Sequence, residues 1–238
     1  MSEVGKYSVE DGGIGVIEID NPPVNALGIK TRLALDAGFR KFAEDDSVKA
    51  IVLICGGRTF FAGADISEFG QPPQEPGLHA VFDIIENGTK PVVAAIHGTA
   101  LGGGYELALI CHYRIAVPSA KVGLPEVNLG LLPGAGGTQR LPRIVGVETA
   151  LDIMTGGAPV PAKKALELGM IDAVAEEGKL REDAIAFART VVDKPLQRVR
   201  DRQDKVAPSR GKPEIYEAYL KKNARAFRGF KAPYNIVR

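Results

Sequence analysis

Two glutamates stand in apolar, glycine-rich segments where a carboxylate is unusual. Glu106 follows three glycines at positions 102–104 in the segment LGGGYELAL, and Glu126 lies within GLPEV at positions 123–127. A carboxylate in apolar surroundings is costly unless it is paired or functional. Burial also raises its pKa towards the range that suits proton transfer. These residues indicate general acid–base chemistry, provided that the fold brings them together.

Two segments that open expected helices carry glycine and could supply backbone donors. Residues 61–65 read FAGAD, and residues 101–106 read LGGGYE. Glycines at a helix start expose backbone N–H groups at the positive end of the helix dipole and let a ligand approach closely. Two such groups converging on one point would form an oxyanion hole, in which one donor is typically worth about 3–4 kcal/mol of transition-state stabilisation.

Each feature also has a simpler interpretation. Glu106 would interact favourably with the dipole of its own helix, Glu126 would suit an exposed loop, and the glycine triplet would suit a helix–strand contact without a ligand. Motifs of other site types do not fit: residues 101–106 are not G-x-G-x-x-G, residues 134–138 lack the lysine of a phosphate-binding loop, and the sequence contains no G-x-S-x-G. His97 and His112 are predicted to be hydrogen-bonded core histidines.

The composition argues against nucleic-acid and membrane partners. Lys plus Arg is 30 and Asp plus Glu is 29, which gives no strong field of either sign. No apolar run approaches the ~18 residues of a membrane span, and the N-terminus lacks the apolar region of a signal peptide. Cys55 and Cys111 lie in apolar runs and are predicted to be buried free thiols, and no Cys/His spacing indicates a metal site. We expect a soluble, cytoplasmic protein.

The chain becomes polar and basic near its C-terminus. Residues 198–231 are locally basic and could meet a phosphate, although charge runs are usually solvated surface. The weak candidates for such a contact are Lys221, Lys222 and Arg228. We expect residues 1–195 to form the core and residues 196–238 to form a basic helical region.

Alternating strands and helices place these motifs in an α/β fold. Hydrophobic periodicity predicts a hairpin over residues 7–19 and a turn with a short helix over 60–69. Helices are expected at 29–43, 78–86, 98–109, 148–154, 162–168, 181–192 and 214–227. Strands are expected at 49–55, 91–97, 113–117 and 170–174. This alternation implies parallel strands joined by crossover helices.

Four segments resemble the crotonase (enoyl-CoA hydratase/isomerase) superfamily. They are NPPVNAL from Asn21, FFAGADISEF from Phe60, KPVVAAIHGTALGGGYELAL from Lys90 and VGLPEVNLGLLPGAGGTQRLPRIVG from Val122. The segments HYRIA and GLPEV are most similar to the N-terminal hydratase/isomerase part of multifunctional β-oxidation enzymes. The resemblance implies an α/β crotonase-like spiral of repeated ββα units with a helical C-terminal region.

The resemblance also implies roles for individual residues. Glu106 and Glu126 align with the two acids of hydratases, and Ala64 and Gly103 align with the backbone donors to the thioester carbonyl. The other candidates for contact with an acyl-coenzyme A are Asn25, Ala26, Ala62, Asp65, Ile66, Gly102, Tyr105 and Pro125. Tyr105 is expected to narrow the acyl pocket. Coenzyme A enters as part of the substrate, and the resemblance implies no separate cofactor.

The implied activity is hydration of the 2,3 double bond of a trans-2-enoyl-CoA. A Δ3,Δ2-enoyl-CoA isomerase needs the same oxyanion hole but only one acid, so isomerase or dual activity stays open, as does a non-catalytic acyl-CoA-binding relative. The family usually forms homotrimers or dimers of trimers, and a eukaryotic source would imply a peroxisomal location. The sequence ends at Arg238 without a dehydrogenase part, so a single-domain protein and a part of a longer multifunctional chain both fit.

Overall fold

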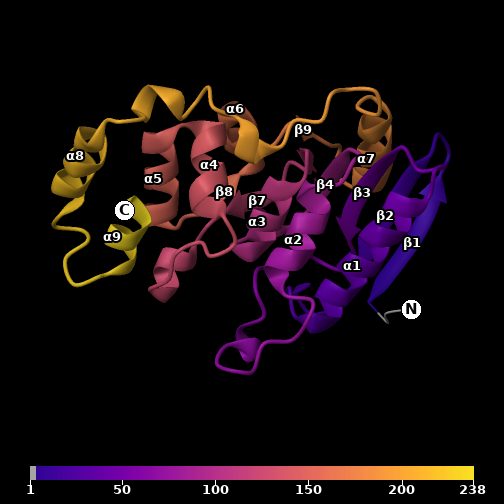
Figure 1. The fold of residues 1–238 in the computed structure, drawn as a ribbon, viewed down its shortest axis with the longest axis horizontal. Coiled ribbons are helices and arrows are strands. Elements are labelled where there is room, and N and C mark those ends of the chain that lie inside the picture. The colour runs from indigo at the N-terminus through magenta and orange to yellow at the C-terminus, as the bar shows by residue number, and fades with distance from the viewer. Residues whose placement is uncertain (1–3) are drawn as a thin grey trace.

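The computed structural model describes residues 4–238, whose elements form two β-sheets with helices packed around them (Figure 1). The first three residues of the polar N-terminus lie outside this description. The larger sheet has the strand order β1-β2-β3-β4-β6-β9, and the smaller sheet has the order β5-β7-β8. The strands are β1 Gly5–Glu10, β2 Ile14–Ile19, β3 Ala50–Cys55, β4 Val92–Ile96, β5 Thr99–Leu101, β6 Tyr113–Ala116, β7 Lys121–Gly123, β8 Val160–Pro161 and β9 Ala173–Val174.

The larger sheet begins with the predicted hairpin and continues with buried parallel strands. β1 and β2 pair antiparallel across a turn in which Gly12 and Gly13 have φ of +83° and +77°, which glycine adopts without steric cost. The other pairs in this sheet are parallel. Every residue of β3 and β4 is buried, as expected for parallel strands covered on both faces. The strand predicted over 170–174 is shorter and is limited to β9.

The chain alternates between the two sheets and so forms a spiral of ββα units. β4 belongs to the larger sheet and β5 to the smaller; after helix α3 (Gly103–Ile110) the chain returns to β6 in the larger sheet and β7 in the smaller. The helix predicted over 98–109 therefore begins only at Gly103. Residues 99–101 are a strand instead, because they pair with β7 and Leu101 N donates to Phe61 O at 3.2 Å.

Helices cover the sheets and extend the molecule at one end. The remaining helices are α1 Ile29–Glu44, α2 Leu78–Glu86, α4 Gly137–Val145, α5 Val147–Gly156, α6 Ala162–Leu168, α7 Leu180–Arg189, α8 Pro213–Asn223 and α9 Ala232–Val237. Periodicity predicts all of these except α4 and α9. Pro142 lies within α4, and a proline inside a pattern is normally a signal to end a helix. α9 has only 6 residues, which is too short for a helical period to stand out.

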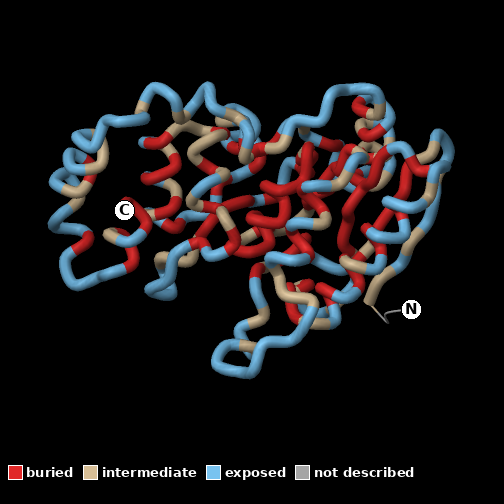
Figure 2. Tube along the Cα trace, viewed as in Figure 1, coloured by how far each residue is buried: buried red, intermediate tan, exposed pale blue. Residues whose placement is uncertain are grey.

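The C-terminal region packs mainly against the helices α3, α4 and α5. It contains the short 3₁₀ helices η3 (Val199–Asp201) and η4 (Ala207–Ser209), followed by α8 and α9. Figure 2 shows that burial is concentrated in the sheets and α3, whereas the surface of this region is largely exposed. Its apolar side chains form a small cluster with Val147 and Leu151, although Val199 and Ile236 reach the main core. The division at residue 195 stays a prediction.

Candidate active site

Two backbone segments lie against each other at the N-terminus of α3. A Cβ built on Gly103 would lie 3.4 Å from Ala64 N, and a Cβ built on Gly104 would overlap Phe61 O. Gly63 and Gly102 have φ of +130° and +52°, which side-chain-bearing residues rarely adopt. The glycines therefore allow residues 61–64 to pack directly against the start of the helix.

The amides of Ala64 and Gly103 are both available to a ligand. Neither N–H donates to an acceptor within residues 4–238. Gly103 is the first residue of α3 and is buried, and an unpaired N–H in a buried residue is uncommon. It also lies at the positive end of the helix dipole. Two adjacent donors of this kind can stabilise a negatively charged oxygen.

The carboxyl of Glu106 is held by the loop that precedes α4. Its Oε1 accepts hydrogen bonds from Ala135 N at 2.8 Å and from Gly137 N at 2.7 Å. The residue is only 3% exposed. Because Gly137 is the first residue of α4, the carboxyl lies at the positive end of that helix as well. One oxygen of Glu106 is thus fixed by two amides.

Glu126 approaches the glycine triplet from a different element. It is the first residue of the 3₁₀ helix η2 (Glu126–Leu129) and follows Pro125. Its Oε1 lies 3.2 Å from the position that a Cβ of Gly102 would occupy. Its Oε2 is buried and has no hydrogen-bond partner among the described residues. Buried polar atoms normally have a partner, so this oxygen is expected to bind water or a substrate group.

Burial raises the pKa of both carboxyls. Burial is the largest cause of the rise in the pKa of Glu126 to about 7, and the negative charge of Glu106 acts in the same direction. Burial also raises the pKa of Glu106. The influences that lower the pKa of Glu106 are, in decreasing order, Gly137 N, Ala135 N, Arg140 and His79. The negative charge of Glu106 thus reaches Glu126, and the two carboxyls lie within electrostatic range of each other.

We expect Glu126→Gln to stabilise the fold above neutral pH and to have little effect in acid. The folded-state pKa of about 7 lies above the ordinary value of 4.5, so the folded chain binds this proton more tightly. Between these two values the unfolded chain ionises first, and the free energy of unfolding falls as the pH rises. Above the folded-state pKa, the free energy of unfolding that is lost by ionising Glu126 is constant. It is about 1–2 kcal/mol after allowance for solvent screening. Urea unfolding at pH ~4.5 and ~8.5 measures the difference.

Glu44→Gln is the matched control for this measurement. Glu44 is exposed at the end of α1, so its replacement should change the free energy of unfolding by less than about 0.5 kcal/mol at either pH. A loss of stability in Glu126→Gln above neutral pH, or an equal gain at both pH values, would contradict the effect of burial on this carboxyl.

A cleft of about 560 Å³ opens beside the donor segments. It lies between residues 21–30 and the loop at 65–74, and Ala26 and Asp65 line it. Ala62 N donates to Val24 O at 3.2 Å, which ties the cleft to the segment that carries the Ala64 amide. Ile66 lies outside this lining and is 67% exposed on the 3₁₀ helix η1 (Ile66–Glu68). Among the predicted contact residues, Ala26, Ala62 and Asp65 thus lie at the cleft or directly behind it.

The side chain of Asn25 has a structural role, and its predicted place along the coenzyme A path stays a prediction. The residue is 3% exposed. Its Nδ2 donates to Gly56 O at 3.0 Å and Thr59 O at 2.8 Å, and its Oδ1 accepts from Asn21 N at 2.7 Å. These bonds use both donors of the amide. They also hold the turn in which Asn25 adopts a φ of +53°.

Tyr105 is enclosed by the protein, and the prediction that it narrows the acyl pocket stays a prediction. It is 0% exposed, and its hydroxyl donates to Met170 O at 2.9 Å, so the ring is part of the core. Successive side chains on an α-helix point about 100° apart. The neighbour of a site-facing glutamate is therefore directed elsewhere, which sequence proximity alone does not reveal.

Three basic residues near the end of the C-terminal region lie away from this site within one chain. Lys221 and Lys222 belong to α8, and Arg228 follows it. Figure 1 places α8 (yellow) beyond α5, at the end of the molecule remote from the loop at 65–74. The predicted contact of these side chains with a phosphate therefore receives no support from the single chain.

The sequence-based interpretation missed the loop that holds Glu106. In the sequence, residues 134–138 suggest only a phosphate-binding loop, for which they lack a lysine. The available signal is the glycine pair Gly136 and Gly137 at the start of α4, which resembles the glycine signal near Gly103. Arg140, which contacts this loop, was missed because its partner lies 54 positions away in the sequence.

The remaining reactive side chains have structural surroundings. His97 Nε2 lies 3.1 Å from Gly57 O, and His112 Nδ1 accepts from Val92 N at 3.2 Å. Cys55 and Cys111 are buried free thiols, as predicted. Within residues 4–238, no group of three or more His, Cys, Asp and Glu side chains is arranged to hold a metal ion. In the same range, no helix combines the length and apolar character that a membrane span requires.

Comparisons with known proteins agree with this geometry. Residues 10–232 match the family model for enoyl-CoA hydratase/isomerase. A peroxisomal bifunctional enzyme of Danio rerio is 46% identical over 98% of this chain and 32% of its own length, and that of Homo sapiens is 49% identical over 82% and 27%. This chain thus spans about a third or less of these relatives. The crystal structure of an enoyl-CoA hydratase from Bacillus anthracis has a TM-score of 0.75 at 31% identity, covering 95% of this chain and 90% of that one. The shared sequence and fold show that this chain belongs to the enoyl-CoA hydratase/isomerase family.

Proposed function

We propose that this chain is an enoyl-CoA hydratase that adds water across the 2,3 double bond of a trans-2-enoyl-CoA thioester. One observation carries the proposal. Two carboxyls with raised pKa, Glu106 and Glu126, come from different elements and lie near the free amides of Ala64 and Gly103. The amide pair alone would suit any reaction through a thioester enolate, whereas the second acid suits the activation of a water molecule.

The amides of Ala64 and Gly103 bind the thioester oxygen in this mechanism. As a nucleophile adds at C3, the electrons of the double bond move towards C1 and negative charge develops on the carbonyl oxygen. Preformed donors stabilise this charge without reorganisation at the moment of reaction. The helix dipole of α3 contributes in the same direction, because Gly103 is its first residue.

Glu106 and Glu126 bind the water and transfer the protons. A carboxylate removes one proton from the water as its oxygen bonds to C3, and a proton reaches C2 to complete the addition. If the pair shares one proton, it contains both the base and the acid that this requires. Glu126 Oε2 is unpaired, and Oε1 of Glu106 is fixed by two amides, so the pair offers oriented oxygens to one solvent molecule.

The coenzyme A part of the substrate would occupy the cleft between residues 21–30 and 65–74. Ala26 and Asp65 lie on its walls, Ala62 lies behind it, and the exposed Ile66 follows Asp65 in the chain. Lys30 also lines the cleft and is a cation that a phosphate could meet. Gly102 and Pro125 contribute by positioning the Glu126 carboxyl rather than by direct contact with the acyl-coenzyme A.

The relatives support a place in fatty acid β-oxidation, since one of them is a peroxisomal fatty acid beta-oxidation multifunctional protein of Arabidopsis thaliana. We extend the proposal to that pathway, to a peroxisomal location in a eukaryotic source and a cytoplasmic one otherwise, and to a homotrimer or dimer of trimers. Light scattering on the purified chain measures the assembly, and a monomer would contradict that part of the proposal.

Mixing the chain with crotonyl-CoA tests the activity directly. We expect the absorbance of the conjugated enoyl thioester to fall, with oxygen from labelled water found at C3 of the product. A 3-enoyl-CoA substrate detects the isomerase through a rise in the same absorbance. Isomerisation without hydration would replace the proposal with an isomerase, and binding of crotonyl-CoA without an absorbance change would identify a non-catalytic acyl-CoA-binding protein.

A further inference from the structure

A buried ion pair joins α2 to α4 close to the candidate active site. Arg140 Nε donates to Glu86 Oε1 at 2.8 Å, and Arg140 Nη2 donates to Glu86 Oε2 at 2.6 Å. The Glu86 side chain is 1% exposed and that of Arg140 is 13% exposed. Two parallel bonds between a guanidinium and a carboxylate fix the orientation of both groups. The third nitrogen of Arg140 is therefore held in one place.

That third nitrogen contacts the loop that holds Glu106. Arg140 Nη1 donates to Ala135 O at 3.3 Å. This carbonyl lies in the chain between Ala135 N and Gly137 N, which are the two donors to Glu106 Oε1. Gly136 makes the contact possible, because a Cβ there would overlap Nη1 and because its φ is +99°. The guanidinium thus folds back over the first turn of its own helix.

This placement is unfavourable for a cation unless other groups offset it. The N-terminus of α4 is the positive end of the helix dipole, and a positive charge there is normally destabilising. The buried carboxylate of Glu86 and the Ala135 carbonyl compensate for it. The guanidinium thus adds a positive charge near Glu106 and bonds to the loop whose amides bind that carboxyl.

We infer that Arg140, held by Glu86, is a positioning residue for Glu106. It fixes the backbone of residues 135–137 so that two amides hold one oxygen of Glu106, and it keeps a positive charge beside that carboxyl. The contacts of Arg140 are observed, whereas its effect on catalysis rests on the proposed hydratase function.

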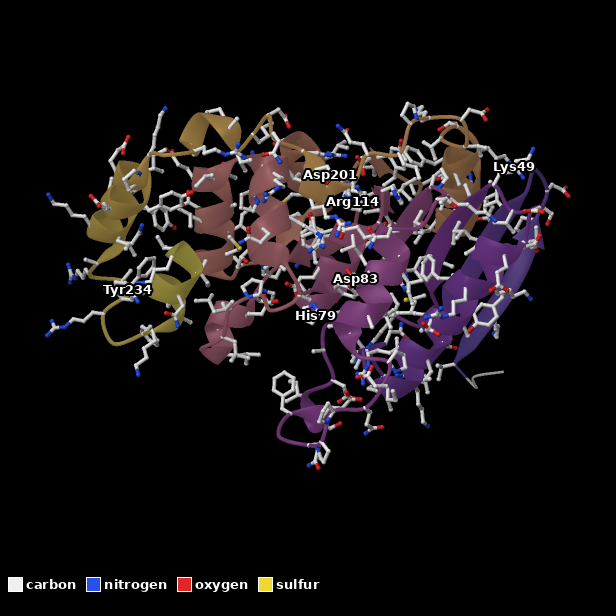
Figure 3. The ribbon with its side chains drawn as sticks, in the orientation of Figure 1. Lys49, His79, Asp83, Arg114, Asp201 and Tyr234 are labelled. Atoms are coloured by element: carbon white, nitrogen blue, oxygen red, sulfur yellow. The ribbon has the colours of Figure 1, made fainter. Side chains whose placement is uncertain are left out.

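The charged groups that face Glu106 come from three packed elements. They are Glu126 of η2, His79 of α2 and Arg140 of α4. Figure 3 shows His79 and Asp83 one above the other on α2, and both are exposed. Arg200 of η3 lies behind the ion pair, with Nη1 3.2 Å from Glu86 Oε2. Arg200 contacts Glu86 but has no hydrogen bond to residues 135–137 within the described chain, which makes it a control for Arg140.

Arg140→Met is expected to lower kcat about tenfold or more and to change KM less than about threefold. Loss of the positive charge raises the pKa of Glu106, so the acid limb of the kcat–pH profile moves to higher pH by about half a unit or more. Arg140→Lys keeps the charge but cannot bind both Glu86 oxygens and the Ala135 carbonyl together. It should lower kcat while leaving the acid limb near that of the parent.

Arg200→Met removes an equal charge from the same Glu86 and should leave kcat within about twofold and the acid limb unshifted. A ¹³C NMR titration of labelled glutamate carboxyls supplies a readout that does not need turnover, with Glu106→Gln assigning the resonance. If the parent does not hydrate enoyl-CoA, the proposed function fails, but this titration still tests the inference. Equal losses of kcat in Arg140→Met and Arg200→Met, with an unshifted Glu106 titration, would overturn it.

If Arg140→Met does not fold, Arg140→Lys alone tests whether Arg140 positions Glu106. We then expect faster hydrogen exchange at the amides of Ala135 and Gly137, because their loop has lost its anchor, together with a lower kcat. Exchange and kcat equal to those of the parent would overturn the inference.

Discussion

Glu106→Gln and Glu126→Gln are each expected to lower kcat for hydration by about 10²–10⁴-fold, the range for the loss of a general acid or base. Glutamine keeps the shape and hydrogen-bonding capacity of the side chain but cannot accept and release the proton. The thioester should still bind, because the Ala64 and Gly103 amides and the cleft are unchanged. The Kd for butyryl-CoA, which has no double bond to hydrate, should therefore change less than about threefold.

Absorbance assays with crotonyl-CoA and calorimetric titration with butyryl-CoA provide the two measurements. Glu182→Gln is the control, because Glu182 is a glutamate in the first turn of α7, away from both carboxyls. Turnover at the parent rate by either active-site variant would remove that residue from the mechanism. A Glu126→Gln variant that loses hydration but still converts a 3-enoyl-CoA would instead assign one acid to both reactions and the second acid to water activation alone.

The sequence predicts those parts of this site that can be recognised from a pattern within one short segment. β3 and β4 are recognisable because each is an unbroken apolar run, and Glu106 and Glu126 because each is an acid in an apolar, glycine-containing segment. The contacts that hold them are not local. Glu106 binds amides 29 and 31 positions away, and Arg140 binds a carboxylate 54 positions away. No periodicity or capping rule relates such positions, so only the folded chain reveals them.

The spiral explains why three distant motifs reach one place. Residues 61–64 follow β3, Gly103 and Glu106 follow β4 and β5, and Glu126 follows β6 and β7. β3, β4 and β6 are consecutive parallel neighbours in the larger sheet. Because parallel strands end at the same edge of a sheet, the segment that follows each strand lies beside the segment from the previous turn of the spiral. The family resemblance supplies the roles, and the strand order supplies the physical reason that they converge.

Gly104→Ala is expected to impair the proposed oxyanion hole without removing any functional group. The added Cβ would overlap Phe61 O, so the segment that carries the Ala64 amide must move away from Gly103. Loss of one donor should lower kcat by about 10²–10³-fold. The same overlap should cost about 1–3 kcal/mol of the free energy of unfolding. Assays well below the unfolding temperature separate the two effects, since a folded but inactive variant isolates the displaced donor.

Gly156→Ala provides the matched control, because a Cβ there meets no atom within 4 Å and the residue ends helix α5. It should keep the parent kcat and gain up to about 0.5–1 kcal/mol of stability from the lower entropy of its unfolded chain. A Gly104→Ala variant with the kcat of the parent would mean that the Ala64 amide tolerates displacement. The stabilisation of the thioester oxygen would then have to come from Gly103 and the dipole of α3 alone.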